Sequence, residues 1–300
     1  MHVVQFQDPE AFLEHTEPVL LENELLNNLP LGILYRLVST MKEEGGIPRH
    51  GEGSSRLFLA TVQSGEQPLL ILIQTQSHLI LYASDEVGGP EQLRACCCEA
   101  VDYIIRQGEV SQIPSIIGLT STSQMFAEVW RDKTGISYHV GMNQRIYRCT
   151  NVNPISESGG HLREAGPDDI PLITKWVLDF SREALEPIPQ EDAERIARRG
   201  VSLSSLYIWD DGGPVSMVQK SRPTQRGIVV TLVYTPTELR GRGYASSSVA
   251  ELTRRLLSSD YEFTCLYTDL SNPVSNHIYM NIGYEPAADS IVYVFDRTGE

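Results

Sequence analysis

The stretch that decides the fold is Val233-Tyr234-Thr235-Pro236-Thr237-Glu238-Leu239-Arg240-Gly241-Arg242-Gly243-Tyr244-Ala245. It begins within a β-branched run over residues 228–235, which predicts a strand. It ends where apolar residues start to recur at helical spacing over residues 245–257. The stretch therefore predicts a strand, a glycine-containing loop and an amphipathic helix in direct succession.

The loop in this stretch has the features of an anion site. The first amides of a helix are unpaired and lie at the positive end of its dipole. Gly241 and Gly243 let the backbone approach an anion closely, and Arg240 and Arg242 add positive charge. In a chain whose formal net charge is −15, such a loop suits a pyrophosphate. The structural alternative is an ordinary glycine-rich turn with solvated arginines.

A dinucleotide-binding fold is a rival interpretation of the same loop. The residues nearly match the G-x-G-x-x-G/A fingerprint, but Ser246 stands at the third position. Only about 55 residues follow the loop, too few for a doubly wound domain. The Rossmann interpretation is therefore poor.

The second half of the chain predicts the order strand, two helices, three antiparallel strands, helix, strand, helix, strand. The predicted strands cover residues 161–165, 205–209, 215–220, 228–235, 263–269 and 291–295. One predicted helix begins near Gly166 and runs towards Leu185. The other predicted helices cover residues 190–199, 245–257 and 273–282.

The first half repeats part of this order about 150 positions earlier. Its predicted helices cover 18–41, 91–107 and 123–132, and its predicted strands 57–62, 69–74, 79–83, 113–119 and 137–147. We interpret the repeat as a tandem duplication of one α/β unit, with two unrelated α+β domains as the alternative. A length of 300 residues suits two domains, and the Ser/Gly-containing residues 151–160 are the expected linker.

Two motifs of the second half resemble signatures of the GNAT superfamily of acyl-CoA-dependent N-acyltransferases. The superfamily's Q/R-x-x-G-x-G/A signature is matched by Arg240-Gly241-Arg242-Gly243-Tyr244-Ala245. Its second hallmark is an Asn after the fifth strand, a Tyr seven residues later and then G-[FY]. Asn272, Tyr279 and Gly283-Tyr284 occupy these places. Both motifs lie in the right order, and the resemblance covers residues 161–296.

The resemblance implies an α/β (α+β) mixed-sheet fold of two tandem GNAT-like units, the C-terminal one intact. The first half, residues 1–150, is similar to the degenerate N-terminal domain of two-domain members. Residues 151–160 are then the linker, and residues 161–300 the N-acetyltransferase catalytic domain.

The resemblance also implies acetyl-CoA as the acyl-donor cosubstrate and assigns residues to it. Backbone groups of Val233, Tyr234 and Thr235 are expected to pair with the pantetheine arm, as an added strand does. The diphosphate is expected at the loop and first helical turn, formed by Arg240, Gly241, Arg242, Gly243, Tyr244, Ala245 and Ser246. Asn272 is expected to contact the pantetheine or the adenine side. Because it precedes a proline, Asn272 is also an expected helix N-cap.

Tyr279 is the expected catalytic residue. In the implied reaction an amine attacks the thioester carbonyl and coenzyme A leaves as a thiolate. Phenol is a weaker acid than a thiol, so a strong hydrogen bond to the thiolate, or proton transfer late along the path, is favoured over early protonation. The alternative role is packing on the sheet. The general base stays open among Asp179, Glu183, Asp210, Asp269 and a water chain.

Composition narrows the partners and the compartment. The negative charge argues against a basic nucleic-acid-binding surface, and the longest aliphatic run, residues 69–73, is too short to span a bilayer. The amino-terminal residues lack the pattern of a signal peptide, and no histidine or cysteine spacing is typical of a metal site. We expect a cytoplasmic monomer or homodimer that uses no metal and binds neither nucleic acid nor membrane.

The expected function is transfer of an acetyl group from acetyl-CoA to a primary amine of a small molecule or peptide in a ternary complex. The alternatives are a non-catalytic acyl-CoA-binding regulator and a glycine-type N-acyltransferase that uses larger acyl groups. We further expect one acyl-CoA per chain. The first half has Gly88-Gly89-Pro90-Glu91 at the place of the arginine loop, Trp130 near the place of Tyr279, and residues 121–123 at the place of Asn272.

Overall fold

The computed structural model describes residues 1–44, 57–75, 77–156, 158–184 and 187–296. Glu157 of the expected linker and Leu185 at the end of a predicted helix lie outside the described residues. Contacts divide the chain into two compact units. Unit 1 comprises Met1–Ile146, Asp269–Ser271 and Ala287–Glu300, and unit 2 comprises Tyr147–Thr268 and Asn272–Pro286.

Unit 1 is a mixed sheet with helices on both faces. Its strands lie in the order β1-β2-β3-β4-β5-β12-β6. The strands are β1 (His2–Phe6), β2 (Leu59–Ser64), β3 (Gln67–Gln74), β4 (Leu79–Ala83), β5 (Ser115–Leu119), β6 (Tyr138–Cys149) and β12 (Glu285–Phe295). The helices are α1 (Pro9–Glu22), α2 (Asn28–Glu44), α3 (Pro90–Gln107) and α4 (Thr120–Thr134).

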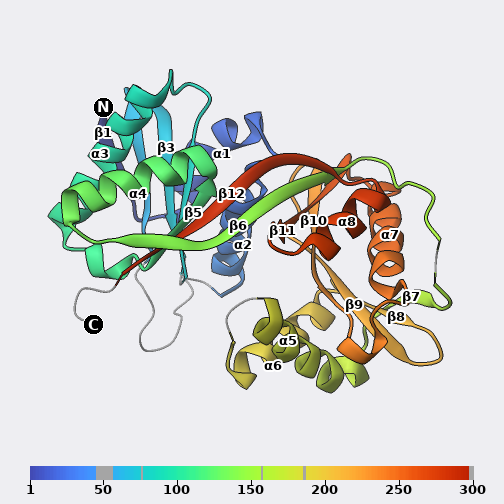
Figure 1. Ribbon diagram of the computed structural model, residues 1–300. Coiled ribbons are helices and arrows are strands. Elements are labelled where there is room, and N and C mark those ends of the chain that lie inside the picture. The colour runs from blue at the N-terminus through green and yellow to red at the C-terminus, as the bar shows by residue number, and fades with distance from the viewer. Residues whose placement is uncertain (45–56, 76, 157, 185–186, 297–300) are drawn as a thin grey trace. The chain divides into compact units, whose positions relative to one another are not determined.

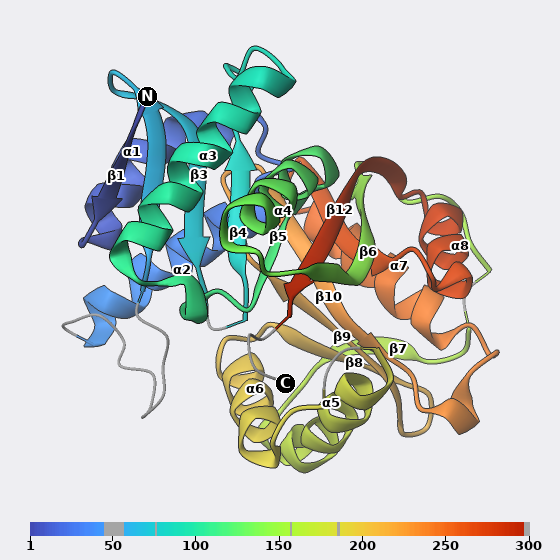
Figure 2. The same cartoon turned by 60° about the vertical axis from the view of Figure 1, so that its left-hand side comes forward.

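Two apolar cores hold these layers together. One lies between the sheet and α3 and α4, and includes Cys97, Val101 and Trp130. The other lies between the sheet and α1 and α2, and includes Phe12 and Leu34. Figure 2 shows α3 and α4 in front of the strands and α1 and α2 behind them.

Unit 2 has the same layered plan. Its strands lie in the order β11-β10-β9-β8-β7. They are β7 (His161–Glu164), β8 (Leu206–Asp210), β9 (Pro214–Ser221), β10 (Gly227–Tyr234) and β11 (Phe263–Asp269). The helices are α5 (Ile170–Ala184), α6 (Gln190–Ser202), α7 (Tyr244–Leu257) and α8 (Pro273–Ile282), with α7 and α8 labelled together in Figure 1.

Opposite faces of the unit 2 sheet carry different cores. Ile228, Val230 and Leu266 pack with α7 and α8 on one face. Met217 and Tyr234 pack with α5 and α6 on the other. The first face is here called the α7 face and the second the α5 face. A ligand at the ends of β10 and β11 therefore has α7 and α8 on one side of the sheet and α5 and α6 on the other.

The predicted elements are largely confirmed, including the repeated order of strand, helix, strand, helix and strand in the two units. Two differences occur in the first half. In place of the continuous helical segment predicted over 18–41, the structure has two helices, α1 (Pro9–Glu22) and α2 (Asn28–Glu44). The strand β1 was not predicted. Among the described residues, no helix is long and apolar enough to cross a membrane.

The last strand differs from the expected domain range. Residues 161–300 were expected to form one domain, yet Ala287–Glu300 group with unit 1. The reason is a ladder in which β12 pairs antiparallel with β5, from Ser290 opposite Leu119 to Val294 opposite Ser115. Ile291 and Phe295 are consequently buried in the core of unit 1. Strand β12 is also longer than predicted, beginning at Glu285 rather than at residue 291.

Candidate functional site

The site predicted from the sequence lies where β10 and β11 diverge within unit 2. The two strands are parallel, and their ladder has three residue pairs, ending at Val229 opposite Cys265. Beyond this point both strands continue, β10 to Tyr234 and β11 to Asp269, without pairing to each other. Past this point the two strands do not bond each other, an arrangement that suits a ligand bound as an added strand along β10.

A β-bulge deforms β10 past the point where the two strands part, and this parting of residues 230–234 from residues 266–269 is here called the cleft. The register between β9 and β10 shifts between Thr231 and Tyr234, and Leu232 has a φ of 50°. Left-handed backbone is uncommon for a non-glycine residue and occurs often at ligand sites. The bulge turns backbone groups of β10 out of the regular ladder.

The loop after β10 leads into α7 as predicted. Gly241 and Gly243 have φ values of 76° and 82°, a conformation that favours glycine. Gly243 is the N-cap of α7, without a side-chain cap, and the first helical turn contains no acidic residue. The amides of Tyr244, Ala245 and Ser246 therefore head the helix with its positive dipole end exposed to the loop.

The two arginines of the loop have different surroundings. The Arg240 guanidinium forms an ion pair with Glu183 of α5, and its Nε donates to the carbonyl of Thr235 at 2.9 Å. Its Cζ also lies 5.7 Å from the centre of the Tyr234 ring. The charge of Arg240 is thus compensated by α5. Arg242 is exposed; the hydrogen bond from Tyr244 to Asp211 raises the pKa of Tyr244, and the nearby charge of Arg242 lowers it.

Residues at the end of β10 already use some of their carbonyls. The carbonyl of Tyr234 accepts from the Ser216 hydroxyl at 2.9 Å, and that of Thr235 accepts from Arg240. The Thr235 hydroxyl donates to Ser216 at 2.9 Å. Burial and the nearby Glu183 and Asp179 raise the pKa of Tyr234 to about 12. These bonds use one lone pair of each carbonyl, and the expected pairing of Val233, Tyr234 and Thr235 with the pantetheine arm stays a prediction.

Residues of the linker pack against the start of α7. The Ser158 amide donates to the Ser247 hydroxyl at 2.9 Å, and the two hydroxyls lie 3.0 Å apart. The Tyr244 hydroxyl donates to Asp211 in the turn between β8 and β9 at 2.8 Å. These contacts fix the first turns of α7 from two sides.

Asn272 has the capping role that its place before Pro273 predicts. Its side-chain oxygen accepts from the Ser275 amide at 3.1 Å, and its carbonyl accepts from the Asn276 side chain at 2.7 Å. The buried Asn276 also accepts from the Tyr147 hydroxyl at 2.8 Å. Contact between Asn272 and a cofactor stays a prediction.

Tyr279 lies on α8, half-buried against the core of the α7 face. Its ring meets Tyr284 edge to face, with centroids 6.1 Å apart. Its hydroxyl has no hydrogen-bond partner among the residues that the structure describes. Burial alone raises the pKa of Tyr279 to about 12, far above that of a thiol. The geometry therefore favours a hydroxyl that donates a hydrogen bond over one that releases its proton.

The four carboxylates considered as general base all have other contacts. Asp179 pairs with Arg182 at 3.3 Å, and Glu183 pairs with Arg240. Asp210 pairs with Arg163 at 3.0 Å and accepts from the Gly213 amide in the β8–β9 turn. Asp269 accepts from the Ser271 amide at 2.8 Å. No base is assigned among them.

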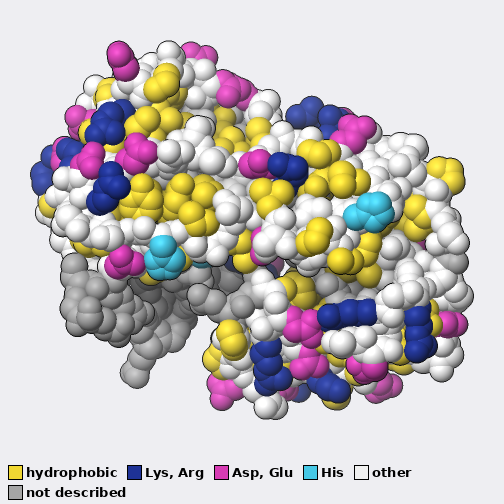
Figure 3. Space-filling model, viewed as in Figure 1, with side chains coloured by type: hydrophobic (Ala, Val, Ile, Leu, Met, Phe, Trp, Pro, Cys, Tyr) yellow, Lys and Arg dark blue, Asp and Glu magenta, His cyan; other side chains and the backbone are white. Residues whose placement is uncertain are grey.

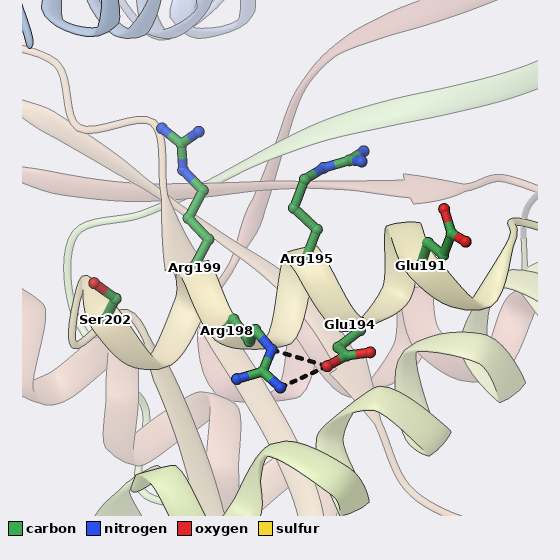
Figure 4. A pocket seen from close by; sticks show the side chains of 6 residues that line it. All are labelled: Glu191, Glu194, Arg195, Arg198, Arg199 and Ser202. Carbon is green, nitrogen blue, oxygen red and sulfur yellow. Dashed lines mark hydrogen bonds and ion pairs between the residues drawn. The ribbon is translucent and has the colours of Figure 1, made fainter. Parts of the chain in front are cut away.

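A surface hollow elsewhere in unit 2 is formed by α6 alone. It is lined by Glu191, Glu194, Arg195, Arg198, Arg199 and Ser202. Figure 4 shows Arg195 and Arg199 extending to one side of the helix, while Arg198 pairs with Glu194 at 2.6 Å. None of the predicted site residues lines it. Within the described ranges, no group of three or more His, Cys, Asp and Glu side chains is arranged to hold a metal ion.

Several features of the site were not predicted. The Leu232 bulge has no sequence signal, because leucine is not a residue that favours positive φ. Ser216 is fully buried between two apolar residues of β9, and a polar residue at such a position could have indicated its role. The Ser158 contact depends on folding of the linker, which its composition does not reveal.

Comparisons with known proteins agree with this geometry. Residues 210–294 match the model of the FR47-like protein family. No curated protein sequence matches the chain. The fold is similar to a Drosophila protein (13% identity, 97% of this chain and 98% of that chain, TM-score 0.64). It is also similar to a tandem GNAT protein from the clavulanic acid biosynthesis pathway, with 13% identity and a TM-score of 0.59. That match covers 100% of this chain and 99% of the other.

A third similar structure is a GCN5-related N-acetyltransferase from Sphaerobacter thermophilus (13% identity, 97% and 94%, TM-score 0.59). At these identities the likeness concerns the fold. The chain thus has the tandem fold of the GNAT superfamily, and its C-terminal half matches the FR47-like family over the residues that form the cleft, the glycine loop and α8.

Proposed function

We propose that the protein is an acyl-CoA-dependent N-acyltransferase that transfers an acetyl group from acetyl-CoA to a primary amine. The observation that carries this proposal is the uncapped start of α7, preceded by two positive-φ glycines at the end of a strand that has parted from its neighbour. Such a helix start suits a diphosphate, and the parted strands suit an extended amide-containing arm.

The chemistry proceeds by direct attack in a ternary complex. The neutral amine forms a C–N bond with the thioester carbonyl, and the C–S bond breaks. Tyr279 donates a hydrogen bond to the leaving sulfur, which lowers the barrier without full proton transfer. The oxyanion is stabilised by a backbone amide of β10 near the bulge.

Thiol release tests the proposal. Purified protein is given acetyl-CoA with amines, amino acids, polyamines or peptides, and free thiol is measured. Amine-dependent release supports the proposal, and a preference for larger acyl-CoA donors changes the donor assignment. Tight binding of coenzyme A without release with any amine would make the chain a non-catalytic acyl-CoA-binding protein.

A further inference from the structure

Arg222, the residue after β9, differs from most arginines of unit 2. Seven of these form ion pairs with carboxylates: Arg163, Arg182, Arg195, Arg198, Arg240, Arg254 and Arg255. Figure 3 shows the same mixture of basic and acidic side chains on one face of the molecule. Among the described residues Arg222 has no ion pair. Its guanidinium lies over the ring of Tyr267, with Cζ 5.8 Å from the ring centre.

Arg222 has a buried donor without an acceptor. Within the described part of the chain, its Nε is buried and has no hydrogen-bond partner, and the same holds for the hydroxyl of the preceding Ser221. Buried donors are normally paired, because leaving them unpaired forfeits their bonds to water. The two Nη nitrogens are not among the buried unpaired atoms, and a guanidinium can bind a carboxylate with two parallel bonds.

The backbone of Arg222 is also strained. Its φ is 46°, in the left-handed region, and Pro223 follows it. Glycine or asparagine adopts this conformation at lower cost than arginine. Strain of this kind is common at sites that hold ligands. The strain and the orphaned Nε are independent observations at one residue.

The strand pairing places the backbone of Arg222 beside the paired start of β10, and its guanidinium reaches Tyr267, where β10 and β11 have parted. Ser221 lies opposite Val229, and Val229 lies beside Cys265. Tyr267 is two residues beyond Cys265 and therefore on the same face of the sheet, past the last pair of β10 and β11. This is the α5 face, since Ile228, Val230 and Leu266 point to the other side. A cofactor bound at the start of α7 comes from the α7 face, which leaves the α5 face for the acceptor.

We propose that Arg222, stacked on Tyr267, binds a carboxylate of the acceptor, so that the acceptor is an amino acid. This inference rests on the proposed acyl-transfer function. In a chain of net charge −15, an anionic acceptor needs a local cation. The reaction then converts an amino acid and acetyl-CoA into an N-acetyl amino acid and coenzyme A. The C–N bond replaces the C–S bond, and the amine proton balances the leaving thiolate.

The experiment compares amino acids with their own amides. Wild-type protein is expected to have a higher kcat/KM for each accepted amino acid than for its amide. Arg222→Asn is expected to lower kcat/KM for amino acids by on the order of 10²-fold and to leave the amides within about threefold. Asparagine tolerates positive φ, so the thermal midpoint is expected to stay at or above that of wild type.

Two further variants sharpen the result. Arg222→Lys keeps the charge but cannot bind a carboxylate with two parallel hydrogen bonds. Its kcat/KM for amino acids is therefore expected to lie between those of wild type and Arg222→Asn. Lys220→Asn is the matched control. Its ammonium lies 5.6 Å from the centre of the Tyr207 ring, and Lys220 is opposite Val230, on the α7 face. Its kinetics are expected to match wild type for both substrate classes.

The outcomes separate this inference from the function on which it rests. If wild type uses amides as well as amino acids, or if Arg222→Asn lowers both equally, Arg222 does not bind the acceptor carboxylate, while acyl transfer stands. If coenzyme A binds but no amine causes thiol release, the proposed function is overturned and this inference with it.

Discussion

The loops that lead into α7 in unit 2 and into α3 in unit 1 hold equivalent places, and both pass through a positive-φ glycine N-cap, Gly243 and Gly89. Of these two helices, α7 has the start that suits an anion better, since its first turn has neither a proline nor an acidic residue. At α3, Pro90 removes one amide, Glu91 adds a negative charge, and the Gly88 amide, just before the N-cap, donates to the Gln92 side chain at 2.8 Å. The start of α3 is thus less suited to an anion.

The parallel strands differ in the same sense. In unit 2, β10 and β11 part after Val229 and Cys265. In unit 1, the ladder of β4 and β5 has two pairs, ending at Ile80 opposite Ile117. One residue further the backbones are still in contact, because a Cβ added at Gly118 would lie 2.6 Å from the carbonyl of Leu81. At this level the space between the two unit 1 strands is therefore taken by their own backbone.

The residues at the place of the catalytic tyrosine complete the contrast. Among the described residues neither the Tyr279 hydroxyl nor the Trp130 indole N–H has a hydrogen-bond partner, so the two residues differ in burial. Tyr279 is half-buried, whereas Trp130 is fully buried and stacks on Phe295 with centroids 4.7 Å apart. Under the proposed function, one fold serves a ligand in unit 2 and its own core in unit 1. The comparison then rests on local differences at equivalent places of the two units.

The strongest test of this contrast is Tyr279→Phe. Removal of the hydroxyl keeps the ring packing and is expected to lower kcat by about 10²–10⁴-fold, with coenzyme A affinity unchanged. Because the pKa of Tyr279 is near 12, ionisation of this phenol is expected to cause no fall in rate below about pH 11. Steady-state kinetics from pH 6 to 11 measure both effects. Trp130→Phe is the matched variant in unit 1, and wild-type activity of Tyr279→Phe would reduce Tyr279 to a packing residue.

The second test concerns the core that unit 1 has kept. Phe295→Ala removes a buried ring from β12 and is expected to lower the free energy of unfolding by about 3–5 kcal/mol. Val274→Ala on α8, where the side chain is 67% exposed, is the control and is expected to change it by less than about 0.5 kcal/mol. Denaturant unfolding followed by tryptophan fluorescence measures both. Equal effects of the two changes would contradict the assignment of β12 to the unit 1 core.

The third test replaces the N-cap glycine of α7, Gly243, and the equivalent N-cap glycine of α3, Gly89, by aspartate. Gly243→Asp places a carboxylate beside the diphosphate and is expected to cost about 1–4 kcal/mol of binding, or roughly 5- to 10³-fold in affinity. Arg242→Glu is expected to act in the same direction. Gly89→Asp meets similar backbone strain in unit 1 and is expected to leave binding unchanged. Calorimetric titration of the full chain with coenzyme A is expected to give a stoichiometry near one, and a value near two would show that unit 1 also binds.

The smallest expected effect separates the two roles of Asn272. Asn272→Ala removes the cap of α8 and is expected to cost about 1 kcal/mol of stability. Asn272→Asp keeps a capping oxygen but loses the amide donor, so its stability is expected to stay near wild type. A weaker coenzyme A affinity in both variants, with the stability of Asn272→Asp near wild type, identifies a cofactor contact. Unchanged affinity in both variants would leave Asn272 as a cap only.

Much of the fold was predictable because its signals are local. The motif over Arg240 to Ala245 predicts a loop and helix start, and Asn272-Pro273 with Gly283 marks both ends of α8, which the structure reproduces. Other features were not predictable in this way. The division of residues 18–41 into two helices has no glycine or proline break at Asn23, and β1 has only five residues.

The sequence by itself determined the succession of elements, the glycine loop before α7 and the cap of α8, since each depends on backbone preferences within a few residues. Only the tertiary structure decided that β12 joins unit 1, because its register is set by β5, about 170 positions earlier. The same holds for the ion pair of Arg240 with Glu183, the bulge at Leu232 and the stacking of Arg222 on Tyr267. These depend on which strands and helices meet, and pairing between distant segments is set by burial across the whole unit rather than by any one stretch of residues.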